Sequence, residues 1–310
     1  MPPDTNPDTF QTQSTIRSLL DQAGISPRKR YGQHFLIDRN LMKRLVEAAE
    51  IAPTDCILEV GAGTGSLTGL LAATGARVLT VEVDSAIAKL AAKAIAPFPN
   101  ATLLQVDALA GKSVIAPELL EAIRLNTRNS AAPLKLVANL PYDIATPLVI
   151  DLLLADLPLV RLCFTVQAEV ADRFLAQPDC SDYGPISIIA QALCKCERIA
   201  KVPPQAFWPA PNVASAMLRL DPLPRNQRPI VDPIAFSHFV RAFFLHRRKT
   251  MGHLARSHSK ADDIFAALSA MNLDPRSRPE TLTVSQWIHL FQAVGDASSP
   301  DGYTRNSGDA

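Results

Sequence analysis

Three groups of residues in this 310-residue chain have the types and spacing needed to hold an adenosine-containing ligand. The segment Gly61-Ala62-Gly63-Thr64-Gly65 follows an apolar run, and its glycines allow a tight turn and a close approach of the backbone to a ligand. Glu82 and Asp107 end the next two apolar runs, where carboxylates could accept hydrogen bonds from ribose hydroxyls and from a base edge. The combination favours an adenosine-containing cofactor. An NAD-dependent enzyme is the second interpretation, because the third glycine of the usual dinucleotide fingerprint is displaced.

A second motif, Asn139-Leu140-Pro141-Tyr142, ends a later apolar run. The exocyclic amine of adenine is a poor nucleophile because its lone pair is delocalised into the ring, so methyl transfer to it needs acceptors that hold its N–H groups. The Asn139 side-chain oxygen and the Leu140 carbonyl could be these acceptors, with Pro141 fixing that carbonyl and Tyr142 offering a ring face. Positioning would supply most of the rate. Asn-x-Pro is also a common turn, but its place beside a cofactor site favours methylation of a base or amide amine.

A proline-rich loop at 202–216 could supply an aromatic face for the substrate. A base must leave its stack to reach a buried methyl donor, and pockets for such bases often hold them between aromatic rings. Phe207 or Trp208 would provide one ring, on a loop whose shape several prolines restrict. On residue type alone, Phe207 is more often a core residue that anchors its loop.

Strand-like and helix-like patterns alternate from Cys56 onward, which is typical of an α/β fold with a parallel sheet covered on both faces. The expected strands are Ile57–Val60, Arg77–Val81, Thr102–Val106, Leu134–Ala138, Val160–Val166 and Ala214–Leu220. The expected helices between them are Leu67–Ala73, Ser85–Ala96, Pro117–Leu125, Thr146–Leu154 and Glu169–Ala176. The motifs described above therefore lie at carboxyl ends of strands, where ligands bind in doubly wound sheets.

Composition suggests where the domains begin and end. Residues 1–13 are rich in Pro, Asp and Thr and residues 296–310 in Ser, Gly and Asp, so both tails are expected to be disordered. One domain is expected over 14–221, with helical and basic segments in its first part, 14–55. A Pro-rich linker then precedes apolar residues at helical spacing, which predicts a small helical domain over 230–295.

The net charge of +1 excludes a uniformly basic protein but hides two basic clusters. Residues 28–44 hold six basic side chains and one acidic one, and residues 225–278 hold ten basic and four acidic ones. Such clusters could bind nucleic acid phosphates locally. Five scattered cysteines fit a reducing compartment, no metal-ligand spacing is present, and the N-terminus carries no secretory or transit pattern, so we expect a cytoplasmic protein.

Several motifs occur in an order that resembles one family. In chain order they are Tyr31-Gly32-Gln33-His34-Phe35-Leu36, the glycine turn, Glu82, Asp107, Asn139-Leu140-Pro141-Tyr142, Ala206-Phe207-Trp208-Pro209-Ala210-Pro211, Ser215-Ala216 and Arg247-Arg248-Lys249-Thr250. With these motifs, residues 25–295 resemble the ribosomal RNA adenine N6-dimethyltransferases of the KsgA/RsmA type. The resemblance implies a Rossmann-like class I S-adenosylmethionine methyltransferase domain followed by a small all-helical C-terminal domain.

The resemblance also implies a reaction and its residues. The expected reaction converts two adjacent adenosines in the 3′-terminal hairpin loop of 16S rRNA, within the immature 30S subunit, to N6,N6-dimethyladenosines. The candidate cofactor-binding residues, for S-adenosyl-L-methionine, are Gln33, His34, Leu36, Gly61, Gly63, Glu82, Asp107 and Asn139. The candidate catalytic residues are Asn139, Leu140, Pro141, Tyr142 and Phe207. The candidate RNA-binding residues, taken from the basic clusters, are Arg28, Lys29, Arg30, Arg247, Arg248 and Lys249.

The sequence departs from the family pattern at a few positions. His34 stands where Asn is also common, and Asp143 stands where the family often has Asn, which could perturb the edge of the pocket. Trp208 and its loop neighbours Ala210, Asn212 and Ala214 replace more usual residues, which could weaken a contact with the RNA backbone.

Other functions remain open at the level of sequence. An Erm-type enzyme acting on 23S rRNA more often has Ile in place of Leu140 and usually lacks the basic helix expected around 247–250. A eukaryotic nucleolar or mitochondrial homologue shares the motifs. A ribosome-assembly checkpoint factor could use the same fold with catalysis as a secondary role. A small-molecule N-methyltransferase would need neither basic cluster. Nothing suggests an obligate interface, so a monomer is expected.

Overall fold

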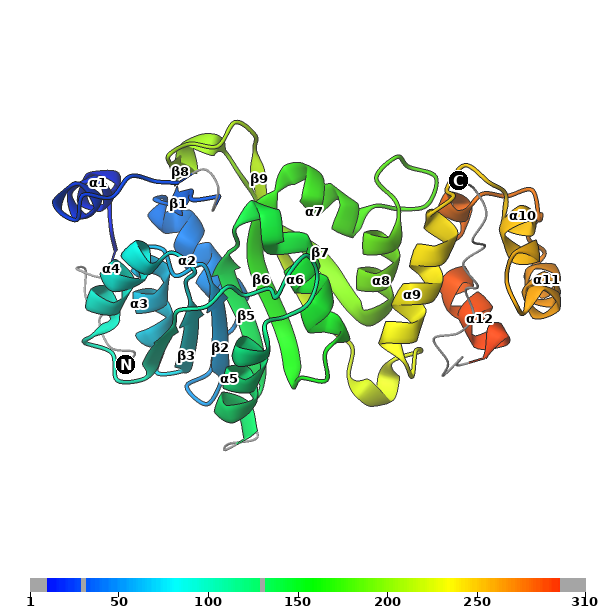
Figure 1. Cartoon of the computed structure of the whole chain (residues 1–310), viewed down its shortest axis with the longest axis horizontal. Helices are drawn as coiled ribbons and strands as arrows, with labels where there is room; N and C mark the ends of the chain where they lie inside the picture. Colours follow the sequence, from blue (N-terminus) through cyan, green and yellow to red (C-terminus); the bar gives the residue numbers. More distant parts are fainter. Residues whose placement is uncertain (1–9, 29–31, 129–131, 296–310) are drawn as a thin grey trace, which may run out of the picture. The chain divides into compact units, whose positions relative to one another are not determined.

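The computed structural model describes residues 10–28, 32–128 and 132–295 (Figure 1). The chain divides into two compact units, one made of Met1–Ala171 and Cys196–Pro222, the other of Asp172–Lys195 and Leu223–Ala310. Expected tail residues 1–9 and 296–310 lie outside the described part. Within that part, no helix combines the length and the apolar character needed to cross a bilayer.

The first unit is built on a seven-stranded sheet in the order β4-β3-β2-β5-β6-β9-β7. The strands are β2 (Cys56–Val60), β3 (Arg77–Val81), β4 (Ala101–Leu104), β5 (Leu134–Asn139), β6 (Leu159–Gln167), β7 (Cys194–Val202) and β9 (Ser215–Pro222). Pairs from β4 through to β6 are parallel, and β9 is antiparallel to β6. The α/β fold class is confirmed, and the expected strands lie within one or two residues of the observed ones.

Helices cover both faces of this sheet because the connections change direction (Figure 1). The chain runs from β2 through β3 to β4 at one edge of the sheet, and then returns to the other side of β2 to form β5 and β6. Crossovers between parallel strands are right-handed, so connections that run in opposite directions along the sheet place their helices on opposite faces. The outward helices are α3 (Ser66–Ala72) and α4 (Ser85–Ile95), and the returning ones are α5 (Pro117–Arg128) and α6 (Tyr142–Leu154). The return makes β2 and β5 neighbours, which brings the glycine turn beside the Asn139 motif.

The N-terminal segment adds helix α1 (Gln13–Gln22), strand β1 (Phe35–Leu36) and helix α2 (Arg39–Ala48) to the first unit. Strand β1 pairs antiparallel with β8 (Phe207–Trp208) in a separate two-stranded sheet, which sequence patterns did not indicate. The expectation of a disordered tail over 1–13 is wrong for residues 10–13. Gln11 is buried. Its side-chain Nε2 donates a hydrogen bond to the Thr64 carbonyl oxygen at 2.9 Å, and its backbone N–H donates to Ser66 Oγ.

The second unit is helical and encloses an aromatic core. It contains the end of α7 (Ala168–Leu175), then α8 (Pro185–Leu193), α9 (Pro233–Phe244), α10 (Met251–Arg256), α11 (Ala261–Ala270) and α12 (Val284–Val294). Trp287 is fully buried, with its ring centroid 5.4 Å from that of Phe243 and 6.3 Å from that of Phe239. Short 3₁₀ turns lie at Arg225–Gln227 and Pro279–Thr281 in this unit, and the turn at Pro204–Ala206 belongs to the first unit.

Two expectations for this part of the chain need correction. The expected domain over 14–221 included residues 172–195, but the structure groups them with the C-terminal unit, because α8 packs against α9 and α12. The basic helix expected around 247–250 is a turn instead. Helix α9 ends at Phe244, and the Thr250 side chain accepts a hydrogen bond from the His253 N–H as the N-cap of α10.

Candidate active site

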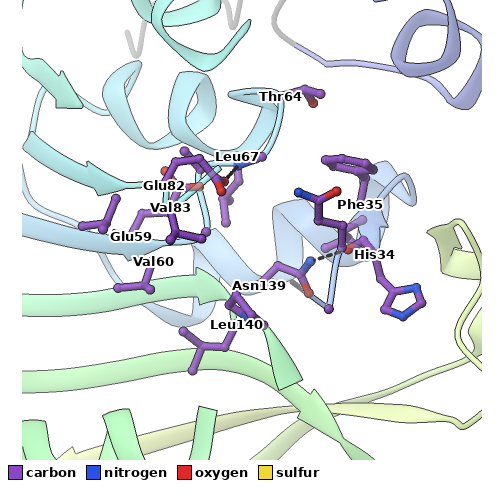
Figure 2. A pocket seen from close by; sticks show the side chains of 18 of the residues that line it. His34, Phe35, Glu59, Val60, Thr64, Leu67, Glu82, Val83, Asn139 and Leu140 are labelled. Carbon is purple, nitrogen blue, oxygen red and sulfur yellow. Dashed lines mark hydrogen bonds between the residues drawn. The ribbon is translucent and has the colours of Figure 1, made fainter. Parts of the chain in front are cut away.

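An open pocket lies at the carboxyl ends of β2, β3 and β5 in the first unit, and the segment 32–36 forms one of its walls (Figure 2). The space inside it, counted together with its open mouth, is ≈ 960 Å³. All of the expected cofactor-binding residues line it: Gln33, His34, Leu36, Gly61, Gly63, Glu82, Asp107 and Asn139. The structure therefore brings the sequence motifs together at one site.

The glycine turn between β2 and α3 requires glycine for conformation and for space. Gly61 and Gly65 have φ angles of 89° and 83°, in the left-handed region that side chains rarely adopt. A Cβ on Gly65 would lie 2.8 Å from the Ala94 Cβ, and one on Gly61 would lie 3.2 Å from Pro141 Cδ. The turn is therefore held close to the Asn139 motif, with bare backbone facing the pocket.

Two carboxylates follow the next two strands, in different surroundings. Glu82 is 7% exposed, and it accepts hydrogen bonds from the Gly63 N–H and the Asp84 N–H, both at 3.0 Å. Burial raises the pKa of Glu82, and these backbone donors oppose that effect. Asp107 is exposed at the pocket wall and accepts from the Leu109 N–H at 3.0 Å. Both retain acceptor capacity for a ligand's hydroxyl or amine groups.

A third carboxyl, Glu59, also lines the pocket, although sequence reasoning assigned it no role. It is 1% exposed, and its Oε2 accepts hydrogen bonds from Thr68 Oγ1 at 2.6 Å and Thr80 Oγ1 at 2.7 Å. Burial is the largest influence on this group and raises its pKa to about 8, with the two hydroxyl donors acting in the opposite direction. Glu59 is therefore mostly protonated at neutral pH. A glutamate inside an otherwise apolar strand was the signal available in the sequence.

The side chain of Asn139 is fixed at one end and unpartnered at the other. Its Nδ2 donates to the His34 carbonyl oxygen at 2.9 Å, the contact drawn as a dashed line in Figure 2. Its Oδ1 is buried, and no group in residues 10–28, 32–128 and 132–295 forms a hydrogen bond with it. A buried acceptor without a partner costs free energy, so this oxygen is poised to receive an N–H donor from a ligand.

Tyr142 and His34 place two rings side by side at the pocket. Their centroids are 5.5 Å apart, with an interplanar angle of 28°. The Tyr142 hydroxyl lies 2.7 Å from Ser215 Oγ, and burial raises the pKa of Tyr142. His34 Nδ1 lies 2.6 Å from the Pro209 carbonyl oxygen. The proline-rich loop therefore contacts the site through Pro209 and Ser215.

Phe207 does not line the pocket, contrary to its expected role as a stacking face. It is 2% exposed and lies in an apolar cluster with Met42 and Leu45, because its backbone pairs with Leu36 in the β1–β8 sheet. This is the core position that residue type alone favoured. Trp208 is half-buried and stacks on Phe35 instead, with the ring centroids 6.4 Å apart.

Comparison with known proteins identifies the family of this fold and site. Residues 24–295 match the family described as ribosomal RNA adenine dimethylase. The chain belongs to this family. Ribosomal RNA small subunit methyltransferase A of Geobacillus kaustophilus (strain HTA426) is 35% identical over 292 residues, which cover 91% of this chain and 96% of that protein. The protein of the same name from Lactiplantibacillus plantarum is 35% identical over 286 residues, covering 91% and 94%.

Solved structures agree on the fold. A dimethyladenosine transferase from Plasmodium falciparum has a TM-score of 0.64 at 21% identity, and the match covers 83% of this chain and 96% of that one. The 23S rRNA methyltransferase ErmE has a TM-score of 0.60 at 24% identity, covering 84% and 99%. The expected Rossmann-like methyltransferase fold with C-terminal helices is confirmed, and so is an rRNA adenine dimethyltransferase activity for this family member.

The basic residues expected to bind RNA differ in how available they are. Arg28 is exposed but forms an ion pair with Asp84 at 3.4 Å, and Lys29 and Arg30 lie outside the described residues. Arg247 donates to the carbonyl oxygens of Cys180 and Ser181 and lies 3.7 Å from a Glu280 carboxylate oxygen. Arg248 and Lys249 are exposed on the turn after α9. Arg247 therefore stabilises the second unit, whereas its two neighbours are accessible.

Asp143 is exposed in the first turn of α6 and does not line the pocket. Leu140 and Pro141 line it next to Asn139, and Leu140 is 2% exposed. Across residues 10–28, 32–128 and 132–295, no three His, Cys, Asp or Glu side chains are grouped as metal ligands would be.

Proposed function

We propose that this dimethylase-family member transfers methyl groups from S-adenosyl-L-methionine to the N6 amines of two adjacent adenosines in the 3′-terminal hairpin loop of 16S rRNA. The substrate would be this rRNA within the immature 30S subunit, and the enzyme would act as a monomer in the cytoplasm. Support comes from relatives at 35% identity that carry the name ribosomal RNA small subunit methyltransferase A. The single observation that carries the chemistry is the buried, unpartnered Oδ1 of Asn139.

The pocket residues fit the proposed cofactor. The glycine turn presents backbone without a Cβ to the pocket, where a Cβ on Gly61 would lie 3.2 Å from Pro141 Cδ, and the Glu82 carboxylate keeps lone pairs for ribose hydroxyls. Asp107 lies at the wall formed after β4, where it could accept from the amine of an adenine base. When bound, S-adenosyl-L-methionine supplies an electrophilic methyl group on a sulfonium. Gln33, His34 and Leu36 would close the wall that faces it.

The Asn139 motif would position the target amine. Asn139 Oδ1 accepts one N–H of the amine, and the Leu140 carbonyl, held by Pro141, accepts the other, so the nitrogen lone pair is directed out of the base plane. The nitrogen becomes strongly acidic once it is alkylated, so its proton can pass to water without a dedicated base. Tyr142 would lie against the base, while Phe207 would support the loop from the core.

Labelled methyl transfer tests the proposal. Purified protein with labelled S-adenosyl-L-methionine should label the 16S rRNA of undermethylated 30S subunits, and mass spectrometry should find N6,N6-dimethyladenosine there. Label in 50S subunits instead would identify an Erm-type substrate, and no label in either would refute the proposal.

Two variants connect the reaction to the pocket. Asn139→Ala should slow transfer more than 100-fold while 30S binding persists, because the acceptor for the amine is removed. Asn126→Ala is a matched control, since Asn126 Nδ2 donates to the Ala122 carbonyl within α5 and Asn126 does not line the pocket. Equal rates for both variants would contradict the role of Asn139.

A further inference from the structure

His34 stands where the two-stranded β1–β8 sheet ends beside the pocket. The register pairs Phe35 with Trp208, so the next opposing residues are His34 and Pro209. Proline has no N–H group to donate across a ladder of backbone hydrogen bonds. Instead, the ring Nδ1 of His34 lies 2.6 Å from the Pro209 carbonyl oxygen. The side chain therefore ties the two segments together one residue beyond the last backbone pair.

This contact fixes which ring nitrogen of His34 carries the hydrogen. A carbonyl oxygen only accepts hydrogen bonds, so Nδ1 must be the donor, and Nε2 is the unprotonated nitrogen of the neutral ring. A neutral imidazole in water prefers the other tautomer, with the hydrogen on Nε2. The ring also packs against Tyr142, with the centroids 5.5 Å apart. Both the tautomer and the orientation of this ring are therefore set by its neighbours.

The backbone of His34 determines which way the Asn139 side chain faces. Its carbonyl oxygen accepts a hydrogen bond from Asn139 Nδ2 at 2.9 Å, the dashed contact in Figure 2. The reversed amide would bring two acceptor oxygens together, so Oδ1 takes the opposite side. There it is buried and has no hydrogen-bond partner in the part of the chain that the structure describes. The carbonyl of residue 34 thus decides that the pocket offers an acceptor and not a donor.

We propose that His34 is a positioning residue for methyl transfer, which holds Asn139 with Oδ1 toward the target amine. The proposal rests on the function proposed above, because it concerns the same amine. The Nδ1–H of the ring anchors residue 34 to Pro209, and the anchored carbonyl binds Asn139 Nδ2. An amide turned by half a rotation would present its own N–H groups to the N–H groups of the amine. His34 therefore acts on the rate of transfer and not on cofactor affinity.

Two substitutions at His34 distinguish the two ring nitrogens. In His34→Asn, the amide nitrogen lies as many bonds from Cα as Nδ1 does, so it can still donate to Pro209. In His34→Gln, the amide nitrogen lies one bond further out and corresponds to Nε2. Single-turnover methylation of undermethylated 30S subunits at saturating S-adenosyl-L-methionine should slow by less than about threefold in His34→Asn and by at least about 20-fold in His34→Gln. His289→Gln, at an exposed position of α12, is the control and should keep the native rate.

Three further measurements separate positioning from a general structural role. The dissociation constant of S-adenosylhomocysteine, measured by calorimetry, should change by less than about threefold in both His34 variants. Added to Asn139→Ala, the change His34→Gln should slow transfer by less than about threefold, because the side chain that His34 positions is already gone. Nitrogen-15 NMR of the histidine rings should find the hydrogen of His34 on Nδ1, with the signal assigned by its absence from His34→Gln.

Equal rates for His34→Asn and His34→Gln would overturn the proposal. So would a full 20-fold loss when His34→Gln is added to Asn139→Ala, or a neutral ring with its hydrogen on Nε2. A loss of cofactor affinity that accounts for the slower rate would overturn it as well, because His34 would then act as a cofactor contact. A native protein that does not methylate 30S subunits would instead refute the proposed function, and the NMR measurement needs no substrate.

Discussion

The buried carboxyl of Glu59 should make the stability of the protein fall as pH rises toward neutrality. Burial raises its pKa to about 8 in the folded protein, from 4.5 as the ordinary value. Between these values the unfolded chain has lost the proton and the folded protein keeps it, so ionisation favours unfolding. The free energy cost is about 1.4 kcal/mol per pH unit. From pH 5.5 to pH 7.5, Glu59 should therefore remove about 3 kcal/mol of unfolding free energy.

Glu59→Gln isolates this contribution. The amide oxygen can still accept from Thr68 and Thr80, but the side chain has no charge to lose. The variant should gain about 3 kcal/mol relative to the native protein when the pH changes from 5.5 to 7.5. Urea unfolding at the two pH values, followed by circular dichroism, measures the difference. Glu121→Gln, at an exposed position on α5, is the control and should shift stability by less than about 0.5 kcal/mol at either pH.

A change of less than about 1 kcal/mol for Glu59→Gln would refute the reasoning. It would mean that the two threonine hydroxyls, which favour the ionised form, outweigh burial. Glu59 would then be a carboxylate at neutral pH and would contribute a negative charge to the pocket.

Three further predictions concern the pocket and its RNA partner. Tyr142→Phe and Ser215→Ala remove opposite ends of one hydrogen bond, so each should slow single-turnover methylation about five- to tenfold. The double variant should be no slower, and additive losses would show that the hydroxyls act separately. Gly65→Ala should lower the unfolding free energy by about 1–3 kcal/mol more than Gly24→Ala, which has a positive φ but open space around it. Equal losses in urea unfolding would exclude the steric clash. Arg248→Gln should reduce the slope of log affinity for 30S subunits against log salt by about 1, and an unchanged slope would remove Arg248 from the interface.

The scaffold of the site was predictable because its signals are local. The strand Arg77–Val81 is found at its expected bounds, since five consecutive residues are buried or nearly so within a parallel sheet. The glycines of the turn indicated a backbone conformation that residues with a side chain rarely adopt, and Gly61 and Gly65 have such φ angles. Strand ends placed Glu82 and Asn139 at one edge, which the pocket confirms.

The parts that were missed depend on contacts between residues distant in sequence. No periodic pattern indicates that Phe207 pairs with Leu36, yet that pairing keeps its ring in the core. Gln11 is polar and lies near the chain start, so only its bonds to Thr64 and Ser66 reveal that it is ordered. The local positive charge predicted that Arg247 binds RNA. In the structure, the guanidinium of Arg247 donates a hydrogen bond to the carbonyl oxygen of Ser181, 66 residues earlier in the chain.

The pairing of β1 with β8 also has a consequence for synthesis. His34 contacts Pro209, which lies 175 residues later in the sequence. The pocket wall that contains His34 is therefore translated early, but the loop that packs against it is translated much later. The five parallel strands, β2 to β6, all precede Pro209 in the chain, although β2 pairs with β5 across the two strands between them, and β9 follows Pro209. A nascent chain that stalls before Pro209 would thus have its parallel strands but an incomplete pocket. Activity should therefore appear only after nearly all of the first unit has left the ribosome that makes it.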